Sequence, residues 1–263
     1  MAYFFLDTHN KEVKMNPKKI NEKENAFLDS LCRRTNETFI LEREYELENG
    51  AHVYSIRPHH ASYFYPEKKS DPKKSICLHY TAGFLTSDIS ALTQKDNHVS
   101  VPYVVDRGGR IYELFDDSFW SFHVGPNAVG GNKIVSQQSI GIEISNYGYL
   151  RAAGDVLLTS YNTNEPYCRL DEVEYFDQRS FRGKEFFASM PPEQISATAA
   201  LVKHLCRKYS IPLKFKNDET LFESDAAARE FAGIFTHANV RKDKFDWPMT
   251  KSMKSVVEAC MSD

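Results

Sequence analysis

Residues 139–148 read SIGIEISNYG, and this short stretch sets the fold class. Isoleucine occupies positions 140, 142 and 144, while Gly141 and Glu143 stand between them. Successive side chains of a β-strand point to opposite faces, so the isoleucines face a core and Glu143 faces the other way. A run this apolar is typical of a strand inside a sheet rather than at its edge. The alternative is a surface glutamate on an edge strand.

A second stretch with the same alternation lies upstream, at residues 75–83, which read SICLHYTAG. Apolar side chains at 76, 78 and 80 fall on one strand face, and Cys77 and His79 fall on the other. Because His79 stands near the end of an apolar strand, a sheet would deliver it to a cleft. Cys77 shares that face and could approach a metal, but a buried inert thiol is the commoner state.

Further segments complete the set of expected elements. Residues 101–115, VPYVVDRGGRIYELF, predict a hairpin around positions 107–109. Residues 191–212, PPEQISATAALVKHLCRKYSIP, carry apolar side chains at helical spacing, and Pro192 and Glu193 suit a first turn. Residues 224–233, SDAAAREFAG, predict a shorter helix. Strands and helices in mixed order predict an α/β fold, a mixed central β-sheet flanked by helices.

The first 70 residues have no obvious connection with the rest of the chain. Residues 14–36 predict a helix, and residues 38–57 predict a hairpin with one wet face and a turn at Asn49-Gly50. The polar stretch PEKKSDPKKS, residues 66–75, is a plausible linker. We therefore divide the chain into an N-terminal extension of unknown role, residues 1–70, and a main domain, residues 71–263.

Composition limits the classes of function. The chain has 263 residues, 41% of them hydrophobic, which is enough for a core. A net charge of -3 gives no support for nucleic-acid binding, and a zinc-dependent nuclease fits poorly for that reason. Five cysteines without a C-x-x-C pair argue against a disulfide framework. Nothing resembles a membrane span or a secretory signal, so we expect synthesis in the cytoplasm.

The stretch FTHANVRKDKFDWP, residues 235–248, places His237 and Asp246 at the two ends of a basic loop. Two ligands on one short loop close a small ring, so organising them costs little chain entropy. With His79 they would form a His–His–Asp set that leaves a fourth position open on zinc. Glu143 stands between Gly141 and Ser145, small neighbours that leave room for a substrate or a metal, and it could then act as a general base beside the metal. The alternative is that these side chains are solvated or cap turns.

Six segments of the sequence resemble a known family. SICLHYTAG, YVVDRGGRIYEL, WSFHVGPN, SIGIEISNYG, the segment 191–212 and IFTHANVRKDKFDWP occur in the order and spacing of zinc-dependent N-acetylmuramoyl-L-alanine amidases. This is the type-2 amidase family, which is similar to phage amidase lysozymes, anhydro-muropeptide amidases and peptidoglycan recognition proteins. The resemblance covers roughly residues 71–250 and implies a zinc site in a surface groove.

The resemblance assigns roles to individual residues. It implies zinc ligands at His79, His237 and Asp246. The family's catalytic lysine lies two residues before the third ligand, which selects Lys244 rather than Lys242, and its glutamate falls on Glu143. The resemblance implies a substrate contact at His123 in the motif WSFHVGPN, and Trp120 and Asn127 of the same motif are further candidate substrate contacts. Trp120 could stack on a sugar ring or pack in the core.

The sequence departs from the family pattern near the second hairpin and after the third ligand. The usual histidine is Pro102, and the tyrosine of phage and animal members falls on Val101, so the role of base passes to Glu143. The usual D-P-G after the ligand is DWP, which keeps Asp246. Residues 150–190 are long for a simple member, and we expect them to form a wall of the groove.

The resemblance implies a peptidoglycan amidase that cuts the bond between N-acetylmuramic acid and L-alanine. The setting would be cell-wall lysis by an endolysin or antibacterial effector, after release or export. A cytosolic muropeptide-recycling amidase and a non-catalytic recognition module are the alternatives. Recognition modules typically lose the third ligand, whereas Asp246 is present. The expected partner is peptidoglycan or a muropeptide, and a monomer is favoured.

Overall fold

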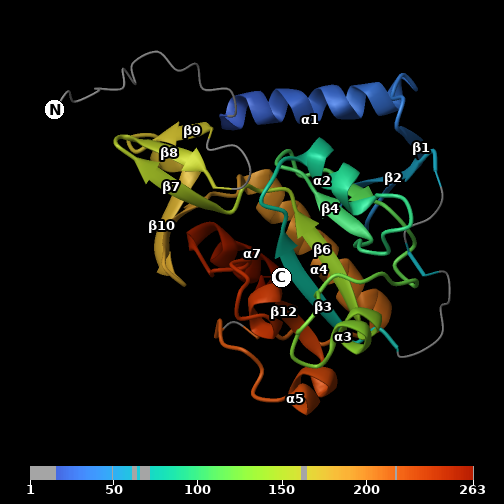
Figure 1. Cartoon of the computed structure of the whole chain (residues 1–263). Helices are drawn as coiled ribbons and strands as arrows, with labels where there is room; N and C mark the ends of the chain where they lie inside the picture. Colours follow the sequence, from blue (N-terminus) through green and yellow to red (C-terminus); the bar gives the residue numbers. More distant parts are fainter. Residues whose placement is uncertain are drawn as a thin grey trace.

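The computed structural model describes residues 16–48, 50–60, 64–65, 72–160, 165–216 and 218–262. Its centre is a seven-stranded mixed sheet (Figure 1). In spatial order the strands are β1 (Phe39–Glu46), β2 (His52–Pro58), β5 (Ile111–Glu113), β4 (Tyr103–Val105), β6 (Ser139–Ile144), β3 (Ser75–Tyr80) and β12 (Gly233–Thr236). The α/β class and the hairpin of β4 and β5 are confirmed.

Strand β6 lies inside the sheet, between β4 and β3, and it is parallel to both. This confirms that the segment with three isoleucines is a central strand. The register sets His79 on β3 directly beside Glu143 on β6. Residues opposite one another in neighbouring strands point to the same face, so this one pairing brings an imidazole and a carboxylate to the same side of the sheet.

The opposite face of β3 and β6 forms the main core. The side chains at 76, 78, 80, 140, 142 and 144 are all buried there, as their alternation predicts. Helix α4 (Pro192–Tyr209) covers this face from behind the sheet in Figure 1, and α7 (Lys251–Met261) packs against α4. Helix α4 ends before Ser210, whose φ of 54° is left-handed.

The N-terminal region continues the central sheet. Helix α1 (Pro17–Cys32) precedes the hairpin of β1 and β2, and β2 pairs in parallel with β5. Val53 and Ile56 of β2 are 0% and 1% exposed. The helix and the hairpin match their predictions, while Asn49 and most of the predicted linker lie outside the described residues. The division at residue 70 stays a prediction about independent folding.

A second sheet of five antiparallel strands is formed by residues 149–188, the segment that is long for the family. Its order is β10 (Phe176–Phe181), β11 (Lys184–Ala188), β7 (Tyr149–Ala153), β8 (Val156–Thr159) and β9 (Pro166–Arg169), with the 3-10 turn η1 (Val173–Tyr175) before β10. From the sequence we expected this segment to form a wall of the groove, but we did not predict that it contains β-strands.

The remaining helices are short. They are α2 (Leu85–Leu92), α3 (Asn132–Gln138), α5 (Asp225–Glu230) and α6 (His237–Val240). Helix α5 was expected from the sequence, and the other three were not. Within the described ranges, no helix is both long enough and apolar enough to cross a membrane.

Candidate metal centre

The loop between β12 and α7 carries two of the expected ligands. Helix α6 begins at His237, and a capping box between Thr236 and Asn239 fixes this start. Asn239 also donates through Nδ2 to the carbonyl of Thr220, which anchors the turn. The loop is closed by its own backbone, because the Ala238 amide donates to the carbonyl of Asp246 at 2.8 Å. His237 and Asp246 are thereby drawn together.

Three ligand atoms meet where this loop approaches the end of β3. His79 Nδ1 lies 3.0 Å from His237 Nδ1 and 3.3 Å from Asp246 Oδ2. His237 Nδ1 lies 3.0 Å from the same carboxylate oxygen. Donors about 2.0–2.1 Å from a tetrahedral zinc ion stand at about this separation from one another. The structure thus brings together the three residues that were predicted as ligands.

The hydrogen bonds around His237 show that the site suits a cation. Its Nε2 lies 3.0 Å from the carbonyl oxygen of Val124, which can only accept, so the Nε2 proton is donated there. In neutral His237 the lone pair of Nδ1 therefore points at the carboxylate of Asp246. Two acceptors at 3.0 Å repel unless a positive charge stands between them. A divalent metal satisfies this donor set.

Electrostatics keep the set in a metal-binding form. Burial, together with the neighbouring His237, lowers the pKa of His79 to about 4, so this imidazole is neutral at pH 7. Burial alone would raise the pKa of Asp246, but positive charge on His237 and hydrogen bonds donated by the two rings would outweigh it, so positive charge beside this carboxylate holds its pKa well below the usual range. A neutral imidazole and an ionised carboxylate are the forms that bind zinc.

Glu143 stands beside these atoms with a free acceptor. Its Oε2 is buried and has no hydrogen-bond partner among the described residues. Burial raises the pKa of Glu143 well above its usual range, and the charges of Asp246 and Asp88 raise it further. The raised pKa favours the protonated carboxyl, so Glu143 can take a proton from water only where positive charge, such as that of Lys244 or of a bound metal, lowers its pKa.

Small neighbours of Glu143 were expected to leave room for a substrate or a metal. The space above Gly141 is instead filled, since a Cβ built there would meet Val101 at 2.5 Å and the ring of His123 at 3.2 Å. Ser145 uses its hydroxyl to donate to Asp88 at 2.8 Å. Gly141 thus makes room for protein side chains.

The ammonium of Lys244 acts on the same cluster. Burial is the main cause of the shifted pKa values of His79 and Glu143, and the charge of Lys244 lowers both pKa values as well. Lys242 is exposed. The backbone of the loop is held from the second sheet, where the guanidinium of Arg182 donates to the carbonyls of Ala238, Arg241 and Lys244.

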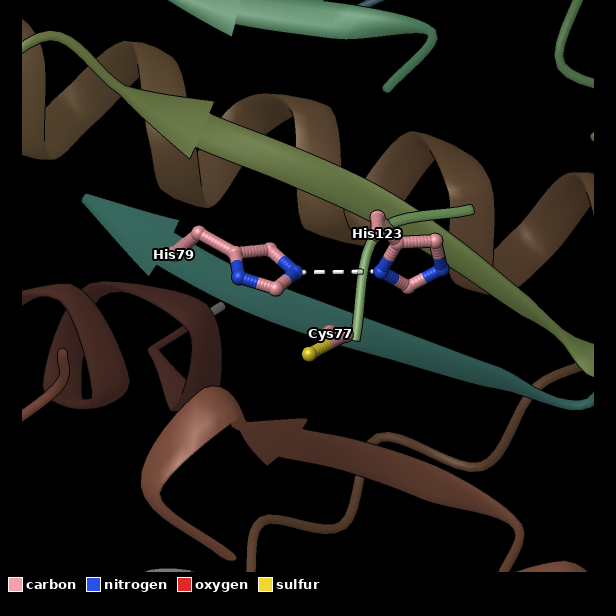
Figure 2. A group of neighbouring side chains, drawn as sticks. All are labelled: Cys77, His79 and His123. Carbon is pink, nitrogen blue, oxygen red and sulfur yellow. Dashed lines mark hydrogen bonds between the residues drawn. The ribbon is translucent and has the colours of Figure 1, made fainter. Parts of the chain in front are cut away.

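His123 lies against the cluster rather than in open solvent. Figure 2 shows its ring beside His79 and Cys77, with His123 Nδ1 3.1 Å from His79 Nε2. Its other ring nitrogen, Nε2, lies 3.0 Å from the Ser139 hydroxyl. Both nitrogens are therefore engaged within the protein, and the contact of His123 with substrate stays a prediction. Cys77 is a free, fully buried thiol, and burial raises its pKa well above the usual range.

The other two expected substrate contacts differ in their surroundings. Trp120 is 7% exposed, and its ring stacks on Tyr65 with centroids 4.2 Å apart. Phe122 meets the same indole edge to face at 5.2 Å. Trp120 is therefore packed within the protein, as its alternative role predicted, and its contact with substrate stays a prediction. Asn127 is exposed, so its predicted role stays open to test.

The His–His–Asp cluster could hold a divalent metal, and it lies next to a carboxylate oxygen that has no hydrogen-bond partner among the described residues. Residues 68–248 match a family model described as N-acetylmuramoyl-L-alanine amidase. This match spans more than half of the chain, and the protein belongs to that family. The resemblance noted from the sequence motifs is thereby confirmed.

A comparison with individual proteins finds AmiD, an N-acetylmuramoyl-L-alanine amidase of Escherichia coli (strain K12). It is 29% identical over 143 residues, which are 52% of this chain and 41% of AmiD. The chain thus matches less than half the length of this relative.

Solved structures give a weaker likeness. The E. coli AmiD complex with anhydro-N-acetylmuramic acid-L-Ala-D-gamma-Glu-L-Lys has a TM-score of 0.43 at 22% identity, covering 69% of this chain and 55% of that one. Staphylococcus aureus AmiA in complex with its ligand has a TM-score of 0.45 at 14% identity, covering 95% and 94%. At these TM-scores the likeness carries no inference about function.

Proposed function

We propose that this protein is a zinc-dependent amidase that hydrolyses the bond between the lactyl group of N-acetylmuramic acid and L-alanine. One observation carries the proposal: the ligand atoms of His79, His237 and Asp246 lie within 3.3 Å of one another. Family membership supplies the substrate class, and the sequence relative AmiD, itself an N-acetylmuramoyl-L-alanine amidase, supports it.

The chain's own residues divide the work. His79, His237 and Asp246 would hold zinc, which supplies Lewis-acid activation of a carbonyl and of water when bound. The free Oε2 of Glu143 accepts the proton of the attacking water and returns it to the leaving nitrogen. Lys244 places a positive charge where negative charge grows on the carbonyl oxygen.

A non-catalytic recognition module is the main alternative. It would need the substrate surface but neither a third ligand nor a base. Asp246 supplies a third candidate ligand, and Glu143 Oε2 has no hydrogen-bond partner within the described ranges, so an enzyme accounts for more of the site's residues. We further propose cell-wall peptidoglycan, reached after release or export, as the substrate rather than small cytosolic muropeptides.

Mass spectrometry of the products tests both parts of the proposal. The purified protein is incubated with intact peptidoglycan and, separately, with soluble muropeptides, and His79→Ala serves as the control for contaminating activity. We expect stem peptides with a free L-alanine amine and intact glycan strands. Chelation should stop the reaction and zinc should restore it.

Two other product patterns would count against the proposal. Cleavage within the glycan or between amino acids would show a different activity. Binding of peptidoglycan without any product would favour the recognition module. Faster turnover of soluble muropeptides than of intact wall would favour recycling over lysis.

A further inference from the structure

The dipeptide His123–Val124 touches both histidines of the metal cluster. Val124 offers its backbone carbonyl to His237 Nε2 at 3.0 Å, and His123 offers its ring to His79 Nε2 at 3.1 Å. Both contacts are made to the nitrogen that points away from the cluster. The two candidate ligands come from β3 and α6, which are far apart in the sequence. The dipeptide His123–Val124, here called the strap, contacts both of them.

The protons along this strap can be placed from one end. Ser139 donates its single hydroxyl proton to the carbonyl of Val135 at 2.6 Å. Its oxygen is then free only to accept, so the proton between Ser139 and His123 sits on His123 Nε2. In a neutral imidazole the other nitrogen, Nδ1, must be an acceptor. His79 therefore donates its Nε2 proton to His123 Nδ1.

The consequence appears at the metal cluster. With its proton on Nε2, neutral His79 presents the lone pair of Nδ1 to His237 and Asp246, which is the form a metal binds. Val124 imposes the same form on His237. We infer that the strap His123–Val124 sets the tautomer and ring orientation of both histidine ligands, so that His123 is a positioning residue. The inference rests on the proposed zinc site.

The surroundings of His123 support a fixed ring. Its backbone amide donates to Ser136 Oγ at 3.2 Å, which holds the strap against α3. A Cβ at position 141 would come within 3.2 Å of the ring, so glycine is the residue that lets His123 lie against β6. Ring and backbone are thus both held where His79 can reach them.

Zinc affinity in matched variants tests the inference. His123→Leu removes the acceptor, whereas His123→Asn keeps one because its Oδ1 stands near the position of Nδ1. Loss of an outer hydrogen-bond partner typically weakens metal binding about 10- to 100-fold. We expect such a loss in His123→Leu, measured by competition with a chelator, and recovery to within about threefold in His123→Asn. The exposed His52 supplies the control, and His52→Leu should bind zinc as the wild type does.

Nitrogen NMR of the histidine rings in zinc-free protein gives a second measurement that does not need activity or metal. In the wild type, His79 should carry its proton on Nε2. In His123→Leu, and more weakly in Ser139→Ala, the proton should redistribute towards Nδ1, where Asp246 can accept it. This result separates the inference from the proposed function, because the tautomer can be correct even if no amidase activity is found.

Three outcomes would overturn the inference. One is equal zinc affinity of the wild type and His123→Leu, and another is an equal loss in His123→Leu and His123→Asn. The third is two zinc ions per chain, one of which disappears in Cys77→Ser. Cys77, His79 and His123 form a second cluster with metal-ligating atoms within 4.8 Å of one another, and a metal held there would mean that His79 Nε2 donates no proton (Figure 2).

Discussion

Two lysines on one loop allow the chemistry to be tested at the scale of single residues. The charge of Lys244 acts on both His79 and Glu143, whereas Lys242 is exposed. Removing a preorganised oxyanion donor lowers turnover by about 10²- to 10³-fold. We therefore expect that loss in kcat for Lys244→Met, with zinc still bound. For Lys242→Met we expect less than about threefold, because exposed charge is screened.

Turnover of both variants on a muramoyl-peptide decides this prediction. A larger loss at position 242 would show that the register of the loop has been misread, and the role of Asp246 would then need revision. Equal losses would mean that the loop acts only through its overall charge.

Glu143 offers a second test at this scale. Glu143→Gln keeps the shape of the side chain and removes the base. The buried Oε2 has no partner in the described part of the chain, so the amide should fit without disturbing β6. We expect zinc to be retained and turnover to fall by roughly 10²-fold or more. A variant with near-normal kcat would show that another group takes the proton.

The sequence predicted the members of the cluster but not all of their roles. The alternation of apolar residues along two strands predicted the sheet face on which His79 and Glu143 lie. The motif that contains His237 and Asp246 predicted the other two members of the cluster. The role of His123 depends on Ser139, sixteen positions away on another element, and on which atom Ser139 itself donates to. The spacing of residues in the sequence does not show these hydrogen bonds. The sequence therefore predicted only the family's role for His123, a contact with substrate.

At the scale of elements, the second sheet supports the metal loop through Arg182. Its guanidinium donates to three loop carbonyls, and hydrogen bonds to charged groups contribute about 1.5–3 kcal/mol each. We expect Arg182→Met to lower the free energy of unfolding by at least about 1.5 kcal/mol and to weaken zinc binding. Thermal melting and chelator competition measure the two effects.

Arg169 on the same sheet is the matched control. It forms ion pairs with Asp155 and Asp171, but its side chain is 52% exposed. Solvent screens ion pairs at the surface, so Arg169→Met should change the stability and the zinc affinity little. If both arginine variants behave alike, the second sheet does not hold the loop.

The strands of this sheet escaped prediction for a physical reason. Residues 151–153 of β7 are all exposed, and the pairing of β10 with β11 shifts register between Gln178 and Phe181. Short strands with solvent-exposed faces and a bulge lack the alternation of apolar residues from which β3 and β6 were predicted. Helix α4 was predictable because its apolar side chains repeat over 18 residues.

At the scale of the whole molecule, the open question is whether the domain folds without the N-terminal region. Phe27, Leu31, Val53 and Ile56 are at most 7% exposed. Burying each contributes roughly 1.5–3 kcal/mol, and a domain is stable by only about 5–15 kcal/mol in total. We therefore expect a chain that starts at Ser70 to lose cooperative melting. The boundary drawn from composition predicts the opposite, a fragment that folds and binds zinc.

Point variants separate this prediction from a general effect of truncation. Ile56→Ala empties a buried site on β2 and should cost about 2–5 kcal/mol. Ile40 on β1 is 47% exposed, and Ile40→Ala should stay within about 0.5 kcal/mol of the wild type. A polar linker near residue 70 suggested a boundary because composition does not reveal that β2 pairs with β5.

The zinc content of the freshly purified protein tests the central claim most directly. If His79, His237 and Asp246 are the ligands, elemental analysis of a preparation made without chelators should find about one zinc ion per chain. His79→Ala and Asp246→Ala should each lose most of it, while His52→Ala should keep it. A wild-type protein without zinc that also fails to take it up, or an Asp246→Ala variant that binds it as tightly as the wild type, would contradict the account.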